Sequence, residues 1–561
     1  MGSINLDNTG SGGAITLSSD GTSLLLDGTA VGGGGGADLF AENYDGSSTK
    51  PTATGTNSIS IGRLATASGN TSFAAGNGAE ASGLQSVSIG YQHSSNPTGE
   101  GAASYGRNSN AAAPYSTAIG ADSVVAGSNS FATALTKSYA SGTDSLAAAI
   151  ASNSSSYGAT NQSSIAIGFQ NKATGSYSAA IGGEASTASG GYSLASGYQA
   201  TASGSSAVAI GSTAVSSATN SFAIGAETEA NGNRTLALGW RAYASGNDAV
   251  AIATDNSTHD GTYGATGGNS LAFGANSLAS GSYTTAINKG TKASGNYSTA
   301  IGVNSGGTGS QAITGAGAMA LGGSYASGTD SFAAAIASNS SSYGATGANS
   351  IAIGNNTKAD GADGVAIGSY FTRASGSLSL ALSRDSHASG TRSVAIGGGE
   401  AEGESSFALG LNAKTEVYGK FAYASSRFSA VGDAQGGQFI LRADTTDATA
   451  TVLTTNNSTA AATNQIVAAS DTCITFDGTI TAMQNGAQAY ASFRIEGLLV
   501  NDGGTTTLAN SATTVIDNQS SWVMALSADN TNNALAITCT GEASHNIRWV
   551  ANIRTTEVTY A

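Results

Sequence analysis

A five-residue phrase that returns about every 14 residues is the feature that most limits what this chain can fold into. It has the form Ser-x-Ala-Ile-Gly and occurs, for example, at residues 116–120, 298–302 and 393–397, with Ser in place of Ala at 58–62. Allowing degenerate endings, 24 copies lie between Ser58 and Gly410. A second phrase, Ala-Ser-Gly, separates the copies, as at residues 67–69. Each repeat therefore contains two segments that end in glycine turns.

Fourteen residues with two turns leave room for two strands of about four or five residues, which is one coil of a β-solenoid. The Ser-x-Ala-Ile-Gly segment is apolar at each central position, so both of its faces should be buried. The other segment alternates small apolar with polar residues, which is typical of a wall with one face in water. We expect Ile, Val, Leu and Phe to fill the coil, with Ala where the backbones come close.

Stacked coils would hydrogen bond strand to strand, and 24 coils at ~4.8 Å each predict a rod of roughly 115 Å. The second face of the apolar strand would form a stripe along that rod, larger than a monomer tolerates. Self-association would cover the stripe, and closed cyclic symmetry would avoid endless filaments.

Composition excludes several other classes of protein. Only 10% of the 561 residues are charged, which is too few for a helical enzyme with solvated helices. The 79 Gly occur with three Pro and no Gly-x-y triplet, which excludes collagen. A net charge of −15 argues against nucleic acid as a partner. No apolar run approaches the ~18 residues of a membrane span, and the N-terminus has no signal-peptide pattern.

Cys473 and Cys539 are expected to be buried thiols, with a cross-strand disulfide as the alternative.

The repeat resembles the head repeat of YadA-like trimeric adhesins. This resemblance covers about residues 57–410. It implies an all-β fold, a left-handed parallel β-roll, and a homotrimer. The residues alone indicate only an oligomer. The family's signal peptide, coiled-coil stalk and membrane barrel are not found in this sequence.

The regions on either side of the repeats have other patterns. Residues 1–56 alternate short apolar segments with Asp-Gly turns and reach a glycine run at 32–36, which predicts a small β module and a linker for virion attachment. Residues 57–413 form the β-roll, and 414–561 an antiparallel β-sandwich that closes the trimer or forms a receptor-binding tip. The strands expected in this last domain are residues 438–443, 473–476, 489–500, 522–526, 534–539 and 547–560.

Two phrases of the C-terminal region, at residues 421–430 and 436–442, and the closing residues 547–561 resemble a C-terminal module of tailed-phage fibre and virion proteins. The opening Leu-Asp-Asn-Thr-Gly-Ser-Gly phrase resembles the same proteins. These similarities imply a phage fibre located in the virion and assembled in the host cytoplasm. Partners would be other virion proteins and a host surface glycan or protein, with no membrane insertion.

Insertions that interrupt the period are the best recognition candidates. Three contain Tyr-Gly-Ala-Thr, beginning at Tyr157, Tyr263 and Tyr343, and His259 lies in the second. Residues 138–168 and 324–354 are nearly identical, which indicates an internal duplication. A tyrosine framed by Ser and Asn suits stacking on a sugar, and packing against a neighbouring chain is the alternative.

No catalytic, cofactor or metal site is expected. The four His are scattered, and Glu400, Glu402, Glu404, Asp360 and Asp363 fit solvated turn residues better than a glycosidase pair. Residues 360–364 lack the third ligand and the spacing of a calcium loop.

The sequence thus predicts a homotrimeric phage adhesion fibre that acts without catalysis. A glycan depolymerase, a bacterial surface adhesin and a receptor-free structural fibre remain as alternatives.

Overall fold

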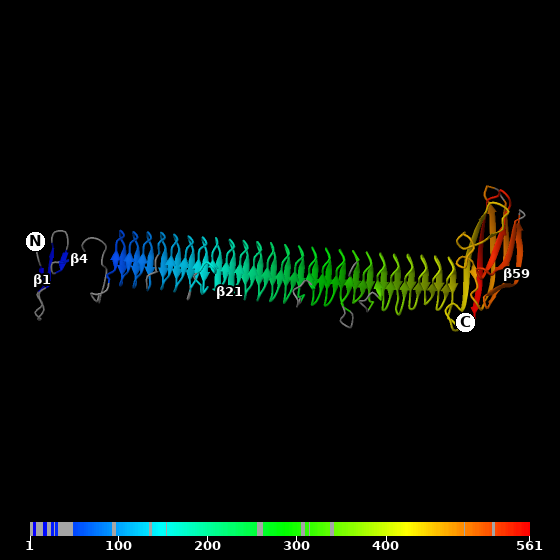
Figure 1. Ribbon diagram of the computed structural model, residues 1–561, viewed down its shortest axis with the longest axis horizontal. Coiled ribbons are helices and arrows are strands. Elements are labelled where there is room, and N and C mark those ends of the chain that lie inside the picture. Colours follow the sequence, from blue (N-terminus) through cyan, green and yellow to red (C-terminus); the bar gives the residue numbers. More distant parts are fainter. Residues whose placement is uncertain are drawn as a thin grey trace. The chain divides into compact units, whose positions relative to one another are not determined.

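The chain divides into two compact units, Met1–Thr266 and Gly267–Ala561, and each is built from β-strands. The computed structural model describes residues 4–6, 15–19, 24–26, 29–31, 49–91, 97–133, 137–152, 154–254, 262–303, 309–312, 315–336, 342–486, 489–518 and 522–560. Within these ranges the chain forms no helix, and so none that could span a membrane (Figure 1).

At the start of the first unit, four short strands form an antiparallel sheet in the order β1-β2-β3-β4. They span Ile4–Leu6, Ile15–Ser19, Leu24–Leu26 and Thr29–Val31. The sheet lies within the region expected to be a β module and linker, and the glycine run at 32–36 lies outside the described residues.

The rest of the first unit is a stack of parallel coils, each with one long and one short strand. The described long strands number fourteen, from β6 (Ile59–Ile61) to β31 (Val250–Ile252). The short strands run from β5 (Thr52–Ala53) to β32 (Gly264–Ala265). Neighbouring long strands pair without shift, so β25 (Val208–Ile210) places Ala209 beside Ala223 of β27 (Phe222–Ile224).

The second unit contains eleven described long strands, from β33 (Leu271–Phe273) to β53 (Phe421–Tyr423). Its short strands run from β34 (Leu278–Ala279) to β52 (Lys414–Thr415). Ten of its long strands precede Gly410, and with the fourteen of the first unit they match the 24 copies counted in the sequence. The parallel ladder continues through β53, past the boundary expected at residue 413. The predicted β-solenoid is therefore confirmed in each unit.

The interior of the coils differs from our expectation. The second residue of each long strand is alanine or serine, and it is buried wherever its side chain is described, as Ala209 in β25 and Ser88 in β10 (Val87–Ile89). A buried Ala also comes from the short strand, as Ala202 in β24 (Thr201–Ala202). The expectation that Ile, Val, Leu and Phe fill the coil was wrong. Because side chains alternate, the two residues that flank this second residue point outward together, and many of them are large and apolar.

Serine and glycine make the turns. Many repeats open with a buried Ser whose hydroxyl donates to the carbonyl three residues earlier, as from Ser86 to Gly83 at 2.7 Å. A Cβ on Gly69 would lie 2.0 Å from the carbonyl oxygen of Gly83 in the next coil, so no side chain fits. At Gly76 the backbone conformation also requires glycine, because residues with a side chain rarely adopt its φ of +125°.

The C-terminal part of the second unit consists of two antiparallel sheets. The larger has the order β53-β54-β62-β57-β58-β59, and we call its last five strands the C-terminal sheet. These span Ala434–Thr445 (β54), Ile547–Thr559 (β62), Thr472–Gln484 (β57), Tyr490–Asp502 (β58) and Thr505–Asn518 (β59). The smaller contains β55 (Thr451–Val452), β61 (Ala534–Thr540), β56 (Ile466–Val467) and β60 (Val523–Asp529).

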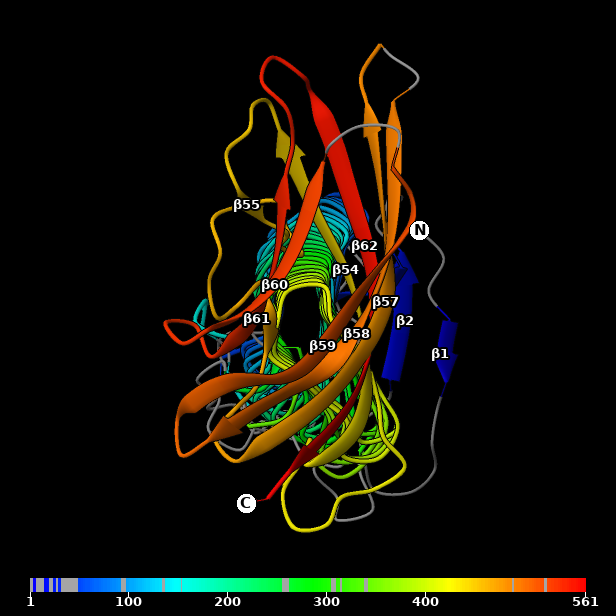
Figure 2. The same ribbon diagram turned by 90° about the vertical axis from the view of Figure 1, so that its right-hand side faces the viewer.

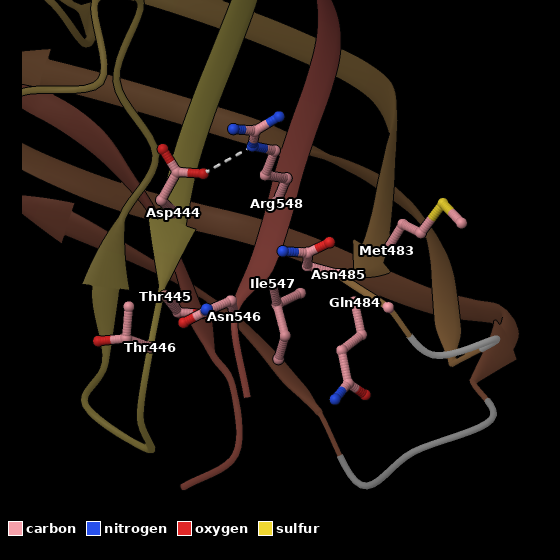
Figure 3. A pocket seen from close by; sticks show the side chains of 10 residues that line it. Asp444, Thr445, Thr446, Met483, Gln484, Asn485, Asn546, Ile547 and Arg548 are labelled. Atoms are coloured by element: carbon pink, nitrogen blue, oxygen red, sulfur yellow. Dashed lines mark ion pairs between the residues drawn. The ribbon is translucent and has the colours of Figure 1, made fainter. Parts of the chain in front are cut away.

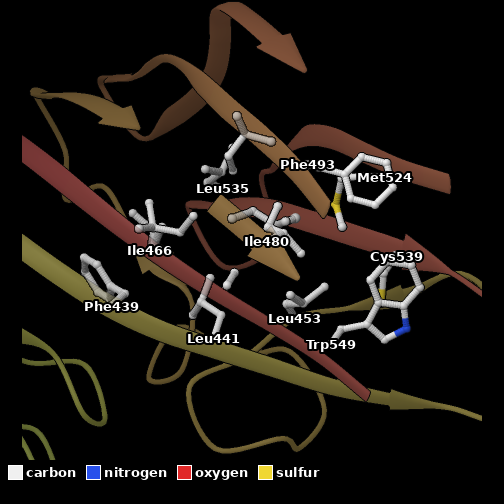
Figure 4. Packing of buried hydrophobic residues seen from close by; sticks show 14 of the residues in the cluster. Phe439, Leu441, Leu453, Ile466, Ile480, Phe493, Met524, Leu535, Cys539 and Trp549 are labelled. Carbon is white, nitrogen blue, oxygen red and sulfur yellow. The ribbon is translucent and has the colours of Figure 1, made fainter. Parts of the chain in front are cut away.

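An apolar core lies between the two sheets. Phe439, Ile480 and Trp549 of the C-terminal sheet pack in one cluster with Leu535 and Cys539 of β61 (Figure 4). Viewed from its end, the domain has the small sheet on one side of β62 and β57 (Figure 2). This arrangement is consistent with the predicted sandwich. The sequence reading missed β59, a polar strand whose residues are largely exposed.

Candidate functional site

The outward face of the long strands is an extended apolar surface of the coils. Ile89, Ile119, Ile181, Ile210 and Leu238 of the first unit are each 37–41% exposed although they are large aliphatic residues. We call this surface the outer face. Monomers rarely expose contiguous apolar patches of this length, so the outer face is a site for burial against another surface.

The outer face is also present in the second unit. Phe273, Met319 and Ile367 are exposed by 39–45%. At its end, the rings of Phe407 and Phe421 stack with centroids 5.3 Å apart. Because these strands pair in register, each outward side chain lies beside its counterpart in the next coil.

The three tyrosine insertions share one local structure. Tyr157, Tyr263 and Tyr343 are each half-buried and directly precede a Gly-Ala strand. In the first insertion this strand is β18 (Gly158–Ala159), in which Gly158 has a φ of +93°. A Cβ there would lie 2.0 Å from the carbonyl oxygen of Tyr139 in the preceding coil. The turn therefore requires glycine beside a tyrosine.

Each insertion has a second tyrosine that our sequence reasoning missed. Tyr139, Tyr243 and Tyr325 open the short strands of the coils before the insertions, and all three are half-buried. The signal was available, because Tyr-Ala-Ser-Gly precedes Tyr-Gly-Ala-Thr in all three places. We call each set of two tyrosines and the glycine a tyrosine module.

Two of the modules are held by an unusual side chain inside the coil. Ile150 and Ile336 are fully buried at the start of the first and third insertions, whereas most other buried side chains of the coils are those of Ala, Ser or Thr. The amide of Ile150 donates to the hydroxyl of Ser138 at 3.3 Å, and that of Ile336 to Ser324 at 3.1 Å. These contacts anchor the insertions to the coil. His259, and likewise His93, lies outside the described residues.

The carboxylates considered for catalysis are engaged in exposed contacts. Asp360 accepts from Arg373 at 2.7 Å and lies 3.5 Å from Lys358. Burial alone would raise the pKa of Asp360, but the hydrogen bond and charge of Arg373, together with Lys358, lower it overall. Glu402 lies 3.7 Å from Lys414. A glycosidase acid needs a raised pKa, which this arrangement does not provide for Asp360.

Two other carboxylates considered for catalysis also pair with side chains of the coils. Glu404 pairs with Arg392, and Asp363 accepts from the side chain of Asn349 at 3.0 Å. The described residues contain no cluster of three His, Cys, Asp or Glu that could hold a metal ion. Of the two thiols, Cys539 is buried and Cys473 half-buried, and both are free, so the cross-strand disulfide is not formed. Burial raises the pKa of Cys539 to about 12.

The loops of the C-terminal domain form a cleft of about 580 Å³ (Figure 3). Residues 444–446, 483–486 and 546–548 line it, so three chain segments contribute. Arg548 lies 3.3 Å from Asp444 at its rim, and Met483 is 63% exposed. A cleft lined by polar groups and the exposed thioether of Met483 could bind a small polar ligand or a peptide loop.

Comparison with known families identifies the coils. The model of the YadA head domain repeat matches residues 53–79, 67–92, 98–123, 111–133, 159–185, 188–214, 202–228, 230–252, 265–287, 289–305, 345–370 and 374–399. These matches fall in both units, and three of them reach into a tyrosine insertion. No curated protein matches the chain. The chain therefore carries YadA head domain repeats, which imply a trimeric adhesin-type fibre.

Proposed function

We propose that this protein is the homotrimeric adhesion fibre of a phage virion and that it binds a bacterial surface glycan or protein without catalysis. The coils would form its shaft, the first 56 residues would attach it to other virion proteins, and assembly would take place in the host cytoplasm. No cofactor is needed for this function.

The exposed outer face is the observation that carries the proposal. Ile210 and Leu238 are among a series of side chains that a folded monomer leaves 37–41% exposed. Three chains with their outer faces on a common axis would bury every member of that series. The YadA head domain repeats support three as the number of chains.

The tyrosine modules are the proposed recognition surface of the shaft. An aromatic face with a hydroxyl group can stack on a sugar ring and hydrogen bond to it. Three modules in each of three chains would give nine weak sites, and these would act together through their effective concentration. The cleft of the C-terminal domain is the second surface on which a receptor could bind.

The oligomeric state tests the first part of this proposal. Native mass spectrometry of the purified chain at micromolar concentration should give three times the 54.5 kDa chain mass. A monomer at this concentration would refute the fibre. Binding is then tested on host cells with Tyr157→Ala and Tyr343→Ala together, against Tyr177→Ala, which lies outside the modules in a stacked pair with Tyr192.

Two further measurements separate the alternatives. Shorter products after incubation with host polysaccharide would indicate a depolymerase and refute adhesion without catalysis. Immunogold labelling should place the protein on phage particles. Labelling of the bacterial surface alone would instead favour a bacterial adhesin, and a labelled particle whose fibre binds no host cell would indicate a structural fibre.

A further inference from the structure

The C-terminal sheet continues the same hydrogen-bonded sheet as the coils of the second unit. Strand β53 pairs in parallel with β51 (Phe407–Leu409) on one side and antiparallel with β54 on the other. In this register Phe421 lies opposite Gln438, and Tyr423 opposite Gly436. Directly opposite residues point to the same side of a sheet. The outer face of the coils therefore continues onto the outward face of the C-terminal sheet.

The chemistry of this continuous face changes at β54. Phe407 and Phe421 lie directly opposite each other on neighbouring strands, and Gln438 lies opposite Phe421. The residues at the same position on the next three strands are Arg554, Asp477 and Glu496. Arg554 donates to Asp477 at 2.7 Å, yet the two side chains are 72% and 44% exposed. The adjacent row holds Ile440, which is 49% exposed.

The charges on this outward face are of both signs. Its members are Arg442, Arg494, Arg548 and Arg554 with Asp444, Asp477 and Glu496. The chain as a whole has a net charge of −15, so most of its surface would repel a second copy. This face instead offers that copy both arginines and carboxylates, which makes it complementary to itself.

The repeats create a need for such a face. Successive coils place Ile210, Ile224 and Leu238 at the same position of the outer face. A second chain displaced by one coil would find nearly the same apolar contacts, so the outer face alone specifies the register weakly. Polar residues at an otherwise apolar interface are an established means of specifying register.

We propose that the outward face of the C-terminal sheet docks against the same sheet of a second copy of this chain and sets the register of the assembled shaft. This inference rests on the proposed trimer. Arg554 of each copy would lie near the carboxylates of Asp477 and Glu496 in the next copy. Such a contact joins two different parts of the surface, and three of them close into a ring.

Accessibility of introduced thiols tests the docking. In the full-length protein with Cys473→Ser, the exposed residue Asn552 is changed to cysteine, and its labelling by a polyethylene glycol maleimide is timed. Thr479→Cys on the neighbouring strand is a second reporter. Thr459→Cys, exposed elsewhere in the domain, is the control. Labelling at 552 and 479 should be at least tenfold slower than at 459 in the assembled protein, and equal to it in denaturant.

Cross-linking tests the register. Thr299→Cys on the outer face should form disulfides between identical residues of aligned chains. Arg554→Glu should lower the yield of this disulfide at least threefold while the trimer mass remains. Arg373→Glu removes an arginine with the same 2.7 Å contact to an aspartate, in a short strand, and should leave the yield unchanged.

The outcomes separate this inference from the proposed function. A monomeric wild-type protein would refute both. A trimer in which positions 552 and 479 label as fast as 459 would refute the docking alone. A trimer with slow labelling, but with an unchanged disulfide yield in Arg554→Glu, would refute the role in register.

Discussion

A buried ion pair joins the last coil to the C-terminal domain, and its removal should weaken that domain more than any exposed pair would. Lys420 occupies the position that Ser406 has one coil earlier, and its ammonium donates to Glu557 at 2.6 Å. The two side chains are 8% and 6% exposed. Glu557 also accepts from Gln435 at 2.8 Å and from Thr555 at 2.7 Å. The carboxylate thus has three donors inside the protein.

Lys420→Met leaves Glu557 buried without its counter-ion. Removing one partner of a buried pair costs about 3–5 kcal/mol of unfolding free energy. For a domain of about 150 residues, each kcal/mol lowers the melting temperature by about 2–4 °C. A loss of about 3 kcal/mol, the lower end of the range above, should therefore lower the melting temperature by roughly 6–12 °C. Burial raises the pKa of Glu557, but the charge and hydrogen bonds of Lys420, with Thr555 and Gln435, lower it overall. In the variant the part of this lowering that comes from Lys420 is lost.

Tryptophan fluorescence can follow this domain, because Trp522 and Trp549 are both in its core. Lys414→Met is the matched control, since Lys414 pairs with Glu416 at the same 2.6 Å but Glu416 is 61% exposed. That variant should lose less than about 1 kcal/mol. Equal melting temperatures for the two variants would refute the reasoning.

The same pair has a defined pH dependence. The pKa of Glu557 is lower in the folded protein than in the unfolded chain, where a Glu titrates near ~4.3. The contribution of Glu557 to the free energy of unfolding is therefore complete at a pH above the pKa of the unfolded chain. It is lost as the pH falls through the lower pKa of the folded protein. Glu557→Gln should flatten this acid limb of the stability profile.

Four other substitutions or measurements test the coils and the core. Gly69→Ala should cost more than ~1 kcal/mol in thermal unfolding, because its Cβ would lie 2.0 Å from a carbonyl oxygen, whereas Gly191→Ala has no contact under 3.9 Å and should cost little. Ile150→Ala should cost about 2–5 kcal/mol, since the side chain is fully buried in a narrow coil. Ile210→Asp should abolish the trimer in native mass spectrometry and, because folding of the coils is linked to association, should also lower their melting temperature in circular dichroism. Cys539 should react with a thiol reagent at pH 8 only after unfolding, since a pKa of about 12 leaves about one thiolate in ten thousand.

The period of the sequence was sufficient to predict the coils, because each strand and turn depends on residues close in the chain. Ser86 and Gly69 mark turns that can be recognised without knowing the fold. The interior could not be predicted from apolarity alone. Whether Ala209 or Ile210 points inward depends on the distance between the two walls, and this narrow distance admits only the smaller side chain.

The sites were less accessible to sequence reasoning than the fold. Tyr157 was found because its phrase recurs, but Tyr139 comes close to it only through the pairing of β16 (Tyr139–Ala140) with β18. Lys420 gave no signal, because Glu557 is 137 residues away. Long-range contacts of this kind follow from topology, which local patterns do not contain.

The small interior also explains why the coils and the assembly should be interdependent. Ala202 and Ala209 contribute two buried methyl groups, worth about 1.6 kcal/mol at ~0.8 kcal/mol each. The outer face holds larger side chains, and Ile210 keeps 38% of its surface exposed. Covering that part would add about 0.6–1.1 kcal/mol, since full burial of such a side chain is worth ~1.5–3 kcal/mol. Each coil thus gains from its neighbours in the assembly an amount comparable with what its own interior supplies, and folding of the coils is linked to association by mass action.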